Sequence, residues 1–397
     1  MSMCKIKSTF TGITVLVIIS VLILCGCQNT RDISVDNANY SEDTEFVGEE
    51  TTFDISVSNS SQIQQWALDN DGSFTAFLYD AGSWAFDTKR AVEDVDINYS
   101  EARSIFSPVR SALVAVIDTD IDTSNSAIAQ SIWQNRDEVA SDGLDNDNNG
   151  FIDDVAGWNF CNNSNILMDP SSNNSVHGTH IVGCLCGYDE KTGFSGVLAQ
   201  TNIKVMCLKA LDGSKEEGSI NNVVSAIKYA ENNGANICCL SFASYKYSDL
   251  LYSVMNKSEM LFVVSAGNDG VSLTNGLSVY PASYKLKNMI SVADLRSDGN
   301  LSYTSNYGSN DVDIAAPGTD IVSTLPNDKY GFLCGTSCAV PYVAGAAALI
   351  YCQSGDLLSA EEIKGAIMHN AKELNTLKGK IISDGMIDLY ASLRFVS

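Results

Sequence analysis

The strongest constraint on the fold is a series of short apolar runs, each of which ends in polar residues. Their length and unbroken hydrophobicity are typical of strands that are buried on both faces of a sheet. The segments between them have helical patterns, such as INNVVSAIKYAENNG (220–234). This alternation predicts an α/β fold with a mostly parallel central sheet and helices on both faces. The expected strands are SALVAVID (111–118), NIKVMCLKAL (202–211), ANICCLSF (235–242) and MLFVVSAGN (260–268).

Three polar residues fall where these expected strands end. They are Asp118, Ser241 and Asn268. The carboxyl ends of parallel strands meet at one edge of a sheet, and binding sites form there. The sequence therefore predicts that a functional site lies at this edge.

Two further segments are predicted to form helices. HGTHIVGCLCG (177–187) opens with polar residues and continues with small apolar ones, which predicts a closely packed helix. LSAEEIKGAIMHNA (358–371) begins with Ser359 and Glu362 at the spacing of a capping box.

The stretch GTSC (335–338) places a hydroxyl beside a thiol at the start of a helix that is expected to run through Tyr351. One interpretation is structural: Thr336 or Ser337 caps the helix, and Cys338 is a small buried apolar residue. The other is that one of these side chains performs chemistry. Taken alone, the stretch favours capping, because Gly-Thr-Ser is ordinary helix-start chemistry.

The charge balance excludes some partners. The chain has 24 Lys and Arg against 48 Asp and Glu, a formal net charge of −24. Such a surface repels phosphate, so nucleic acid and anionic lipid headgroups are not expected partners. Cations and neutral ligands remain compatible with it.

The N-terminus has the pattern of an export signal. Lys5 and Lys7 precede an apolar run, 13–24, which closes with Leu24-Cys25-Gly26-Cys27. This end resembles a bacterial lipobox, which implies that Cys27 is lipidated and becomes the mature N-terminus. The alternative is an uncleaved signal anchor over 10–27, which is almost long enough to span a bilayer. Either way, the rest of the chain is expected outside the cytoplasm, anchored to the membrane.

Three parts of the chain are therefore expected. Residues 1–27 form the lipoprotein-type signal peptide, and the acidic, aromatic-poor residues 28–60 form a flexible tether. Residues 61–397 form one catalytic or binding domain, which is expected to act as a monomer.

Cysteine and histidine usage limits the metal and disulfide chemistry. Nine of the 12 cysteines lie beyond the signal segment, an odd number without zinc-like CxxC pairs, so thiols that fill the core are expected. The three histidines are His177, His180 and His369. HGTH lacks the glutamate of the HExxH metalloprotease motif, which leaves a two-histidine metal site as a minor alternative.

Four sequence blocks carry a family resemblance. They are VAVIDTDID (114–122), HGTHIVG (177–183), SAGNDG (265–270) and GTSCAVPYVAG (335–345). The blocks resemble, in order, those of the subtilisin-like serine peptidases, and the resemblance extends over about 62–397. It implies a three-layer subtilisin-like fold and a serine endopeptidase that acts through an acyl-enzyme intermediate.

The resemblance also implies roles for residues. Asp118 would orient His177, and His177 would take the proton from Ser337 as that serine attacks a peptide carbonyl. Asn268 and the Ser337 N–H would stabilise the oxyanion. Protein or peptide substrates are expected, with no required cofactor. The alternative is a catalytically silent surface lipoprotein that uses the cleft to bind peptides. The residues expected along the substrate are Ser241, Phe242, Ala243, Ser265, Ala266 and Gly267.

Three positions depart from the family pattern. Asp120 replaces a glycine and is expected to bring a second negative charge near Asp118, which would favour protonated His177. Ala243 replaces a glycine and is expected to narrow the cleft. Tyr342 replaces a histidine, away from the expected proton transfer.

The segment DGLDNDNNGFIDD (142–154) resembles the first half of a calcium loop. It offers Asp145, Asp147 and Asn149 at alternate positions, but Ala156 stands where the bidentate glutamate would be. The two interpretations are a calcium site and a solvated acidic turn.

Overall fold

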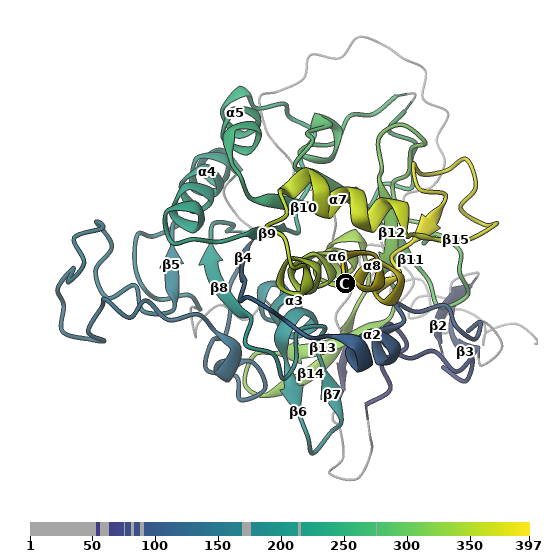
Figure 1. Ribbon diagram of the computed structural model, residues 1–397, viewed down its shortest axis with the longest axis horizontal. Coiled ribbons are helices and arrows are strands. Elements are labelled where there is room, and N and C mark those ends of the chain that lie inside the picture. The colour runs from purple at the N-terminus through teal and green to yellow at the C-terminus, as the bar shows by residue number, and fades with distance from the viewer. Residues whose placement is uncertain are drawn as a thin grey trace, which may run out of the picture.

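A nine-stranded sheet forms the centre of this computed structural model, which describes residues 53–55, 63–74, 76–80, 83–87, 91–168, 176–212, 216–274 and 276–397 (Figure 1). All neighbouring strands are parallel except β15, which is antiparallel to β16. In sheet order the strands are β15 (Lys372–Glu373), β16 (Gly385–Met386), β12 (Ile314–Pro317), β11 (Met289–Leu295), β10 (Leu261–Ser265), β9 (Ile237–Leu240), β4 (Leu113–Asp118), β8 (Lys204–Lys209) and β5 (Gly157–Asn159).

The helices lie on both faces of this sheet. The chain passes from β4 through β5 and α3 to β8, and from β8 through α4 to β9, which lies on the other side of β4. Helix α6 packs against α3 and across β9 to β12, whereas α5 packs against α4. The helices are α2 (Tyr99–Ile105), α3 (His177–Cys186), α4 (Glu216–Asn232), α5 (Asp249–Lys257), α6 (Thr336–Gln353), α7 (Ala360–His369) and α8 (Leu389–Val396), with 3-10 turns η1 (Ala129–Ser131) and η2 (Ala282–Tyr284).

Strand β4 lies at a switch point of this topology. It is the first strand of the central sheet along the chain, with β8 and β5 on one side and β9 to β12 on the other. Such switch points are where open α/β sheets bind ligands. The α/β architecture and the mostly parallel sheet confirm the fold predicted from the sequence.

Small residues let the two central helices approach their neighbours closely. A Cβ on Gly183 of α3 would lie 2.2 Å from the Thr324 hydroxyl, and one on Gly345 of α6 would lie 2.7 Å from Val197. The predicted capping box of α7 is present, because the Ser359 side chain and the Glu362 side chain each accept from the other's backbone N–H.

Three small sheets lie outside the central one. Strand β1, three residues within the range 28–60, pairs antiparallel with β14. Cys27 and the signal segment lie outside the described residues. None of the helices in the described part of the chain is long and apolar enough to cross a bilayer. The small sheets are β1 (Phe53–Ile55) with β14 (Lys329–Leu333) and β13 (Ile321–Leu325), β2 (Ala76–Asp80) with β3 (Ser83–Asp87), and β6 (Tyr188–Asp189) with β7 (Phe194–Ser195).

Candidate active site

Asp118 and His177 meet at the switch point. Asp118 is the last residue of β4 and is fully buried, and His177 is the first residue of α3 with 16% of its side chain exposed. The Nδ1 atom of His177 lies 2.5 Å from Oδ1 of Asp118. Within the described residues, Oδ2 of Asp118 is buried and has no hydrogen-bond partner. The same Oδ1 also accepts from the Thr119 N–H at 2.7 Å, so one oxygen of this carboxylate holds both the imidazole and the following loop.

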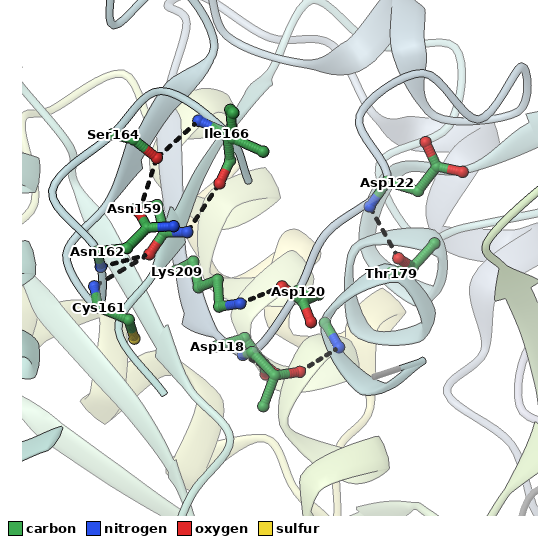
Figure 2. A network of polar contacts seen from close by, with 12 residues as sticks. Asp118, Asp120, Asp122, Asn159, Cys161, Asn162, Ser164, Ile166, Thr179 and Lys209 are labelled. Carbon is green, nitrogen blue, oxygen red and sulfur yellow. Dashed lines mark hydrogen bonds and ion pairs between the residues drawn. The ribbon is translucent and has the colours of Figure 1, made fainter. Parts of the chain in front are cut away.

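The loop after Asp118 is attached to the first turn of α3. The Thr119 hydroxyl donates to Oδ1 of Asp118 at 3.1 Å and accepts from the Gly178 N–H at 3.3 Å. The Asp122 N–H donates to the Thr179 hydroxyl at 2.9 Å, as Figure 2 shows. These bonds fix the position of Asp118 relative to α3.

The charge expected from Asp120 is compensated. Lys209, the last residue of β8, forms an ion pair with Oδ1 of Asp120, and Figure 2 shows the two side chains facing each other beside Asp118. The sequence indicated this second negative charge but could not show its partner, because the register of β4 and β8 places the lysine there. The other two departures from the family pattern, Ala243 and Tyr342, are both buried.

Helix α6 begins at the GTSC stretch, but neither hydroxyl caps it. The N-cap is Gly335, which has no side chain and a φ of 143°. The Thr336 N–H, one of the free donors at the helix start, instead bonds to Oδ1 of Asn268 at 2.9 Å. Ser337 follows in the first turn of the helix, and its carbonyl accepts from the Ser241 hydroxyl at 3.3 Å.

The hydrogen bonds from Thr336 determine the orientation of the Asn268 side-chain amide. Its Oδ1 accepts from both the N–H and the hydroxyl of Thr336, each at 2.9 Å. An N–H can only donate, so the atom facing it must be the oxygen, and Nδ2 must be on the other side. Within the described part of the chain, Nδ2 has no hydrogen-bond partner. A Cβ on Gly335 would come within 3.2 Å of it, so glycine leaves room for this amide.

The residues expected along the substrate lie together at the ends of β9 and β10. The two segments are joined by a hydrogen bond of 3.0 Å from the Ser265 hydroxyl to the Phe242 carbonyl. The Gly267 N–H donates to the Thr336 hydroxyl at 3.2 Å, which attaches the second segment to α6. Both segments, 241–243 and 265–267, are therefore held beside Ser337.

A buried acid behind the loop that carries Ser337 was not predicted. Asp294 of β11 is fully buried, and burial raises its pKa to about 8. The Thr319 hydroxyl donates to both of its oxygens, each at 3.0 Å. A Cβ on Gly318 would lie 2.6 Å from Asp294 and 2.7 Å from the Gly335 carbonyl, so this acid packs directly behind the loop that carries Ser337.

Burial makes most of the cysteine thiols poor nucleophiles. The nine in the described residues are thiols rather than parts of disulfides, and seven of them are buried. Burial raises the pKa of the Cys161 thiol to about 11 and those of Cys184 and Cys352 to about 12. Thiols with such pKa values remain protonated at neutral pH and are poor nucleophiles. Cys338, beside Ser337, is fully buried.

The acidic loop gathers three carboxylates, one of which the sequence did not reveal. Oxygens of Glu138, Asp145 and Asp147 lie within 4.8 Å of one another. The side chain of Asn149 forms other hydrogen bonds: its Oδ1 accepts from the Phe151 N–H at 2.7 Å, and its Nδ2 donates to Asp147 at 2.9 Å. Glu138 lies before the DGLDNDNNG motif, so the loop pattern alone could not indicate it.

The other histidines lie apart from this geometry. His180 is buried and its Nε2 contacts the Ile321 carbonyl at 2.9 Å. His369 is the last residue of α7 and stacks near Phe395. The minor alternative of a two-histidine metal site concerned the HGTH pair, His177 and His180. The geometry does not favour it, because Nδ1 of His177 contacts Asp118 and Nε2 of His180 contacts the Ile321 carbonyl.

Comparison with known proteins agrees with this geometry. The sequence model of the Subtilase family matches residues 110–385. The chain belongs to the subtilase family. Two similar proteins are subtilisin-like protease 1 of Plasmodium falciparum isolate 3D7, 33% identical over 303 residues, and the major intracellular serine protease of Bacillus subtilis strain 168, 34% identical over 242 residues.

The extent of these matches differs. The Plasmodium match covers 71% of this subtilase and 43% of that protein, whereas the Bacillus match covers 60% and 67%. This chain thus spans less than half the length of the Plasmodium relative. Among solved structures, a protease from Pseudoalteromonas arctica PAMC 21717 superposes with a TM-score of 0.59 at 23% identity, over 76% of this chain and 94% of that one. That similarity shows the fold.

Proposed function

We propose that this subtilase is a serine endopeptidase that hydrolyses peptide bonds through an acyl-enzyme on Ser337. The observation that carries the proposal is the 2.5 Å contact between buried Asp118 and His177. A serine hydroxyl is a weak nucleophile until a base removes its proton, and an imidazole held by a carboxylate is such a base.

The contact also fixes the proton on the imidazole. An ionised carboxylate only accepts hydrogen bonds, so Nδ1 of His177 must be the donor. The lone pair is then on Nε2, on the other side of the ring. When Nε2 takes the Ser337 proton, the ring becomes positive, and the Asp118 charge stabilises it. The same proton then goes to the leaving amine.

The oxyanion of the tetrahedral intermediate needs fixed donors. Nδ2 of Asn268 and the N–H of Ser337 at the start of α6 supply them in this proposal. The two Thr336 bonds to Oδ1 hold the Asn268 amide before substrate arrives. Donors that do not reorganise during the reaction stabilise the developing charge most effectively.

Ser337 is favoured over Cys338 as the nucleophile by helix geometry. Adjacent residues of a helix point about 100° apart, so both cannot address one imidazole. The Cys338 side chain is fully buried. The substrates would be extended peptides lying along 241–243 and 265–267, and no step of this chemistry requires a cofactor.

We also propose that the protein is an extracytoplasmic lipoprotein attached through Cys27. Support comes from the lysines, the apolar run and the Leu24-Cys25-Gly26-Cys27 ending. Mass spectrometry of the membrane-bound protein should find a lipidated N-terminal Cys27. Retention of residues 1–26 would instead establish the signal anchor.

Calcium is proposed as a structural ligand of the acidic loop. Carboxylate oxygens are the ligands that Ca²⁺ prefers, and Glu138, Asp145 and Asp147 bring three of them close together. Three carboxylates that lie so near one another repel each other unless a cation separates them. The loop is distinct from the residues of the reaction, so the ion would stabilise the fold and take no part in catalysis.

A labelled fluorophosphonate tests the peptidase proposal against the peptide-binding alternative. Stoichiometric labelling of wild type at Ser337, absent in Ser337→Ala and retained in Cys338→Ala, supports the enzyme. Folded wild-type protein that binds peptides but is not labelled would establish the silent binding module.

A further inference from the structure

The Asp120–Lys209 ion pair is an unusual feature of the active-site corner. The Lys209 and Asp120 side chains are only 12% and 5% exposed. Removing two charges from water is costly, and a buried pair often adds no net stability over apolar residues. Stability alone is therefore a weak reason for this pair, and its position suggests a more specific one.

The pair joins the two segments that hold Asp118. In the parallel register of β4 and β8, Lys209 is directly opposite Asp118, and the N–H groups of Ala210 and Leu211 donate to the Asp118 carbonyl at 3.0 and 3.2 Å. Asp120 follows Asp118 by two residues. The ion pair thus attaches the loop after Asp118 to the end of β8, in addition to these backbone bonds.

The same loop packs closely against the start of α3. A Cβ on Gly178 would lie 2.7 Å from the Asp120 carbonyl oxygen, so there is no space between them. Gly178 directly follows His177. A shift of Asp120 would therefore move the backbone beside the imidazole as well as the loop that carries Asp118.

The charges around His177 are mostly negative. Strand β13 and the first turn of α6 bring no charged residue, and β9 brings Cys239, whose pKa burial raises, as a neutral thiol. The remaining groups are Asp118, the loop residues Asp120 and Asp122, Lys209 and Asp212 after β8, Cys161 after β5, and His180 of α3. Lys209 offsets the negative charge nearest to Asp118.

We infer that Asp120 and Lys209 are positioning residues of the peptidase, which together keep the loop 118–122 seated on α3 while adding no net charge beside His177. The inference rests on the proposed function, because it assigns His177 as the base. Its two parts are separable: the contact positions Asp118, and the matched charges leave the titration of His177 undisturbed.

Three variants separate these parts: Asp120→Asn, Lys209→Met and the double variant. Loss of Lys209 leaves the Asp120 carboxylate without its cation, which favours protonated His177. The acid limb of the kcat/KM profile should move to higher pH by about 0.5 unit or more. Asp120→Asn should move it lower by a similar amount, and the double variant should return it to the wild-type position. All three should lose roughly tenfold in kcat/KM at the optimum, because the contact is gone.

A matched control exists on the opposite part of the sheet. Lys364 and Asp313 form a similarly covered ion pair at 2.8 Å, with 23% and 7% of their side chains exposed. Lys364→Met and Asp313→Asn make the same changes in net charge and should leave the acid limb in place. Equal shifts in the control variants would overturn the inference, since they would reflect overall charge alone.

Histidine NMR gives a readout that does not need activity. With three histidines in the chain, the His177 signal is assigned from its loss in His177→Gln. Its titration midpoint should move in opposite directions in the two single variants. Shifts in one direction, or none in variants with native thermal midpoints, would overturn the inference. If the wild type were inactive while the two single variants still moved the His177 midpoint in opposite directions, the proposed function would be wrong and the charge coupling would stand.

Discussion

Two groups of carboxylates in this molecule differ in how they are held. Those at the edge of the central sheet, Asp118 and Asp294, are fully buried, and Oδ2 of Asp118 has no hydrogen-bond partner among the described residues. Those of the acidic loop accept backbone N–H groups. Glu138 accepts from Asn146 at 2.6 Å, and Asp145 from Gly150 at 2.9 Å.

The difference separates reactivity from structure. The charge of a buried carboxylate such as Asp118 acts strongly on the imidazole that faces it, because its buried surroundings screen that charge little. A carboxylate that accepts several backbone donors shapes its own loop instead. We therefore expect changes at Asp118 to alter turnover, changes at Asp294 to alter how stability depends on pH, and changes in the loop to alter stability alone.

The largest effect should come from the nucleophile. Ser337→Ala should lose at least about 10³-fold in turnover on a fluorogenic peptide, as when one member of a catalytic triad is removed. Cys338→Ala should keep most of its activity and resist peroxide better, because it has no sulfur to oxidise beside the oxyanion site. Both variants should have native circular dichroism. Activity that survives in Ser337→Ala and vanishes in Cys338→Ala would reverse the assignment.

The next effect concerns the oxyanion donor. Asn268→Ala should lower kcat by about 10²–10³, the magnitude known for removing one such donor from a subtilisin, with little change in KM. Thr336→Val, which keeps the N–H donor to Asn268 but removes the hydroxyl, should cost less. A larger loss in KM than in kcat would show that Asn268 binds the ground state instead.

For the acidic loop, the expected effect is on stability alone. Calcium at 100 times its Kd should stabilise the fold by about 2.7 kcal/mol, which raises the thermal midpoint by a few degrees. Glu138→Gln should abolish most of this increase and leave kcat/KM unchanged. Chelator-treated protein that melts identically with and without calcium would refute the site.

The smallest effect should come from Asp294, and it depends on pH. Unfolded, this carboxyl loses its proton near its ordinary pKa of 3.8, whereas the folded protein retains it to about pH 8. Between these values the folded state binds more protons, so stability falls as pH rises from about 4 to about 8 and then levels off. Asp294→Asn should therefore melt a few degrees above wild type at pH 8 and close to it at pH 4. An equal difference at both values would show that the effect is packing rather than ionisation.

The sequence predicts those parts of the fold that depend on local pattern. The strand at 111–118, the helix at 177–187 and the capping box at Ser359 are all present, since continuous apolar runs and cap spacing act within a few residues. Strands such as β5 and β12 have only three and four residues and were not predicted, because pairing in the sheet rather than propensity stabilises them.

The candidate site divides in the same way. Asp118, His177, Asn268 and Ser337 could be named because sequence blocks carry them. Lys209 beside Asp120 could not, because the register of β4 and β8 joins residues 89 positions apart. Glu138 and Asp294 escaped for the same reason: their partners are brought together by tertiary packing, which no short motif encodes.

The orientation of Asn268 has a consequence for how this protein would age in storage. Deamidation turns an asparagine into an aspartate, which has two acceptor oxygens and no donor when ionised. At residue 268, one oxygen would still accept both Thr336 bonds, so the surrounding loop would be retained. The other would place negative charge where the amide donor had been. A preparation deamidated at this one side chain would keep a native thermal midpoint, and its mass would differ by only about one dalton. Its residue 268 would nevertheless repel the oxyanion that the amide should stabilise.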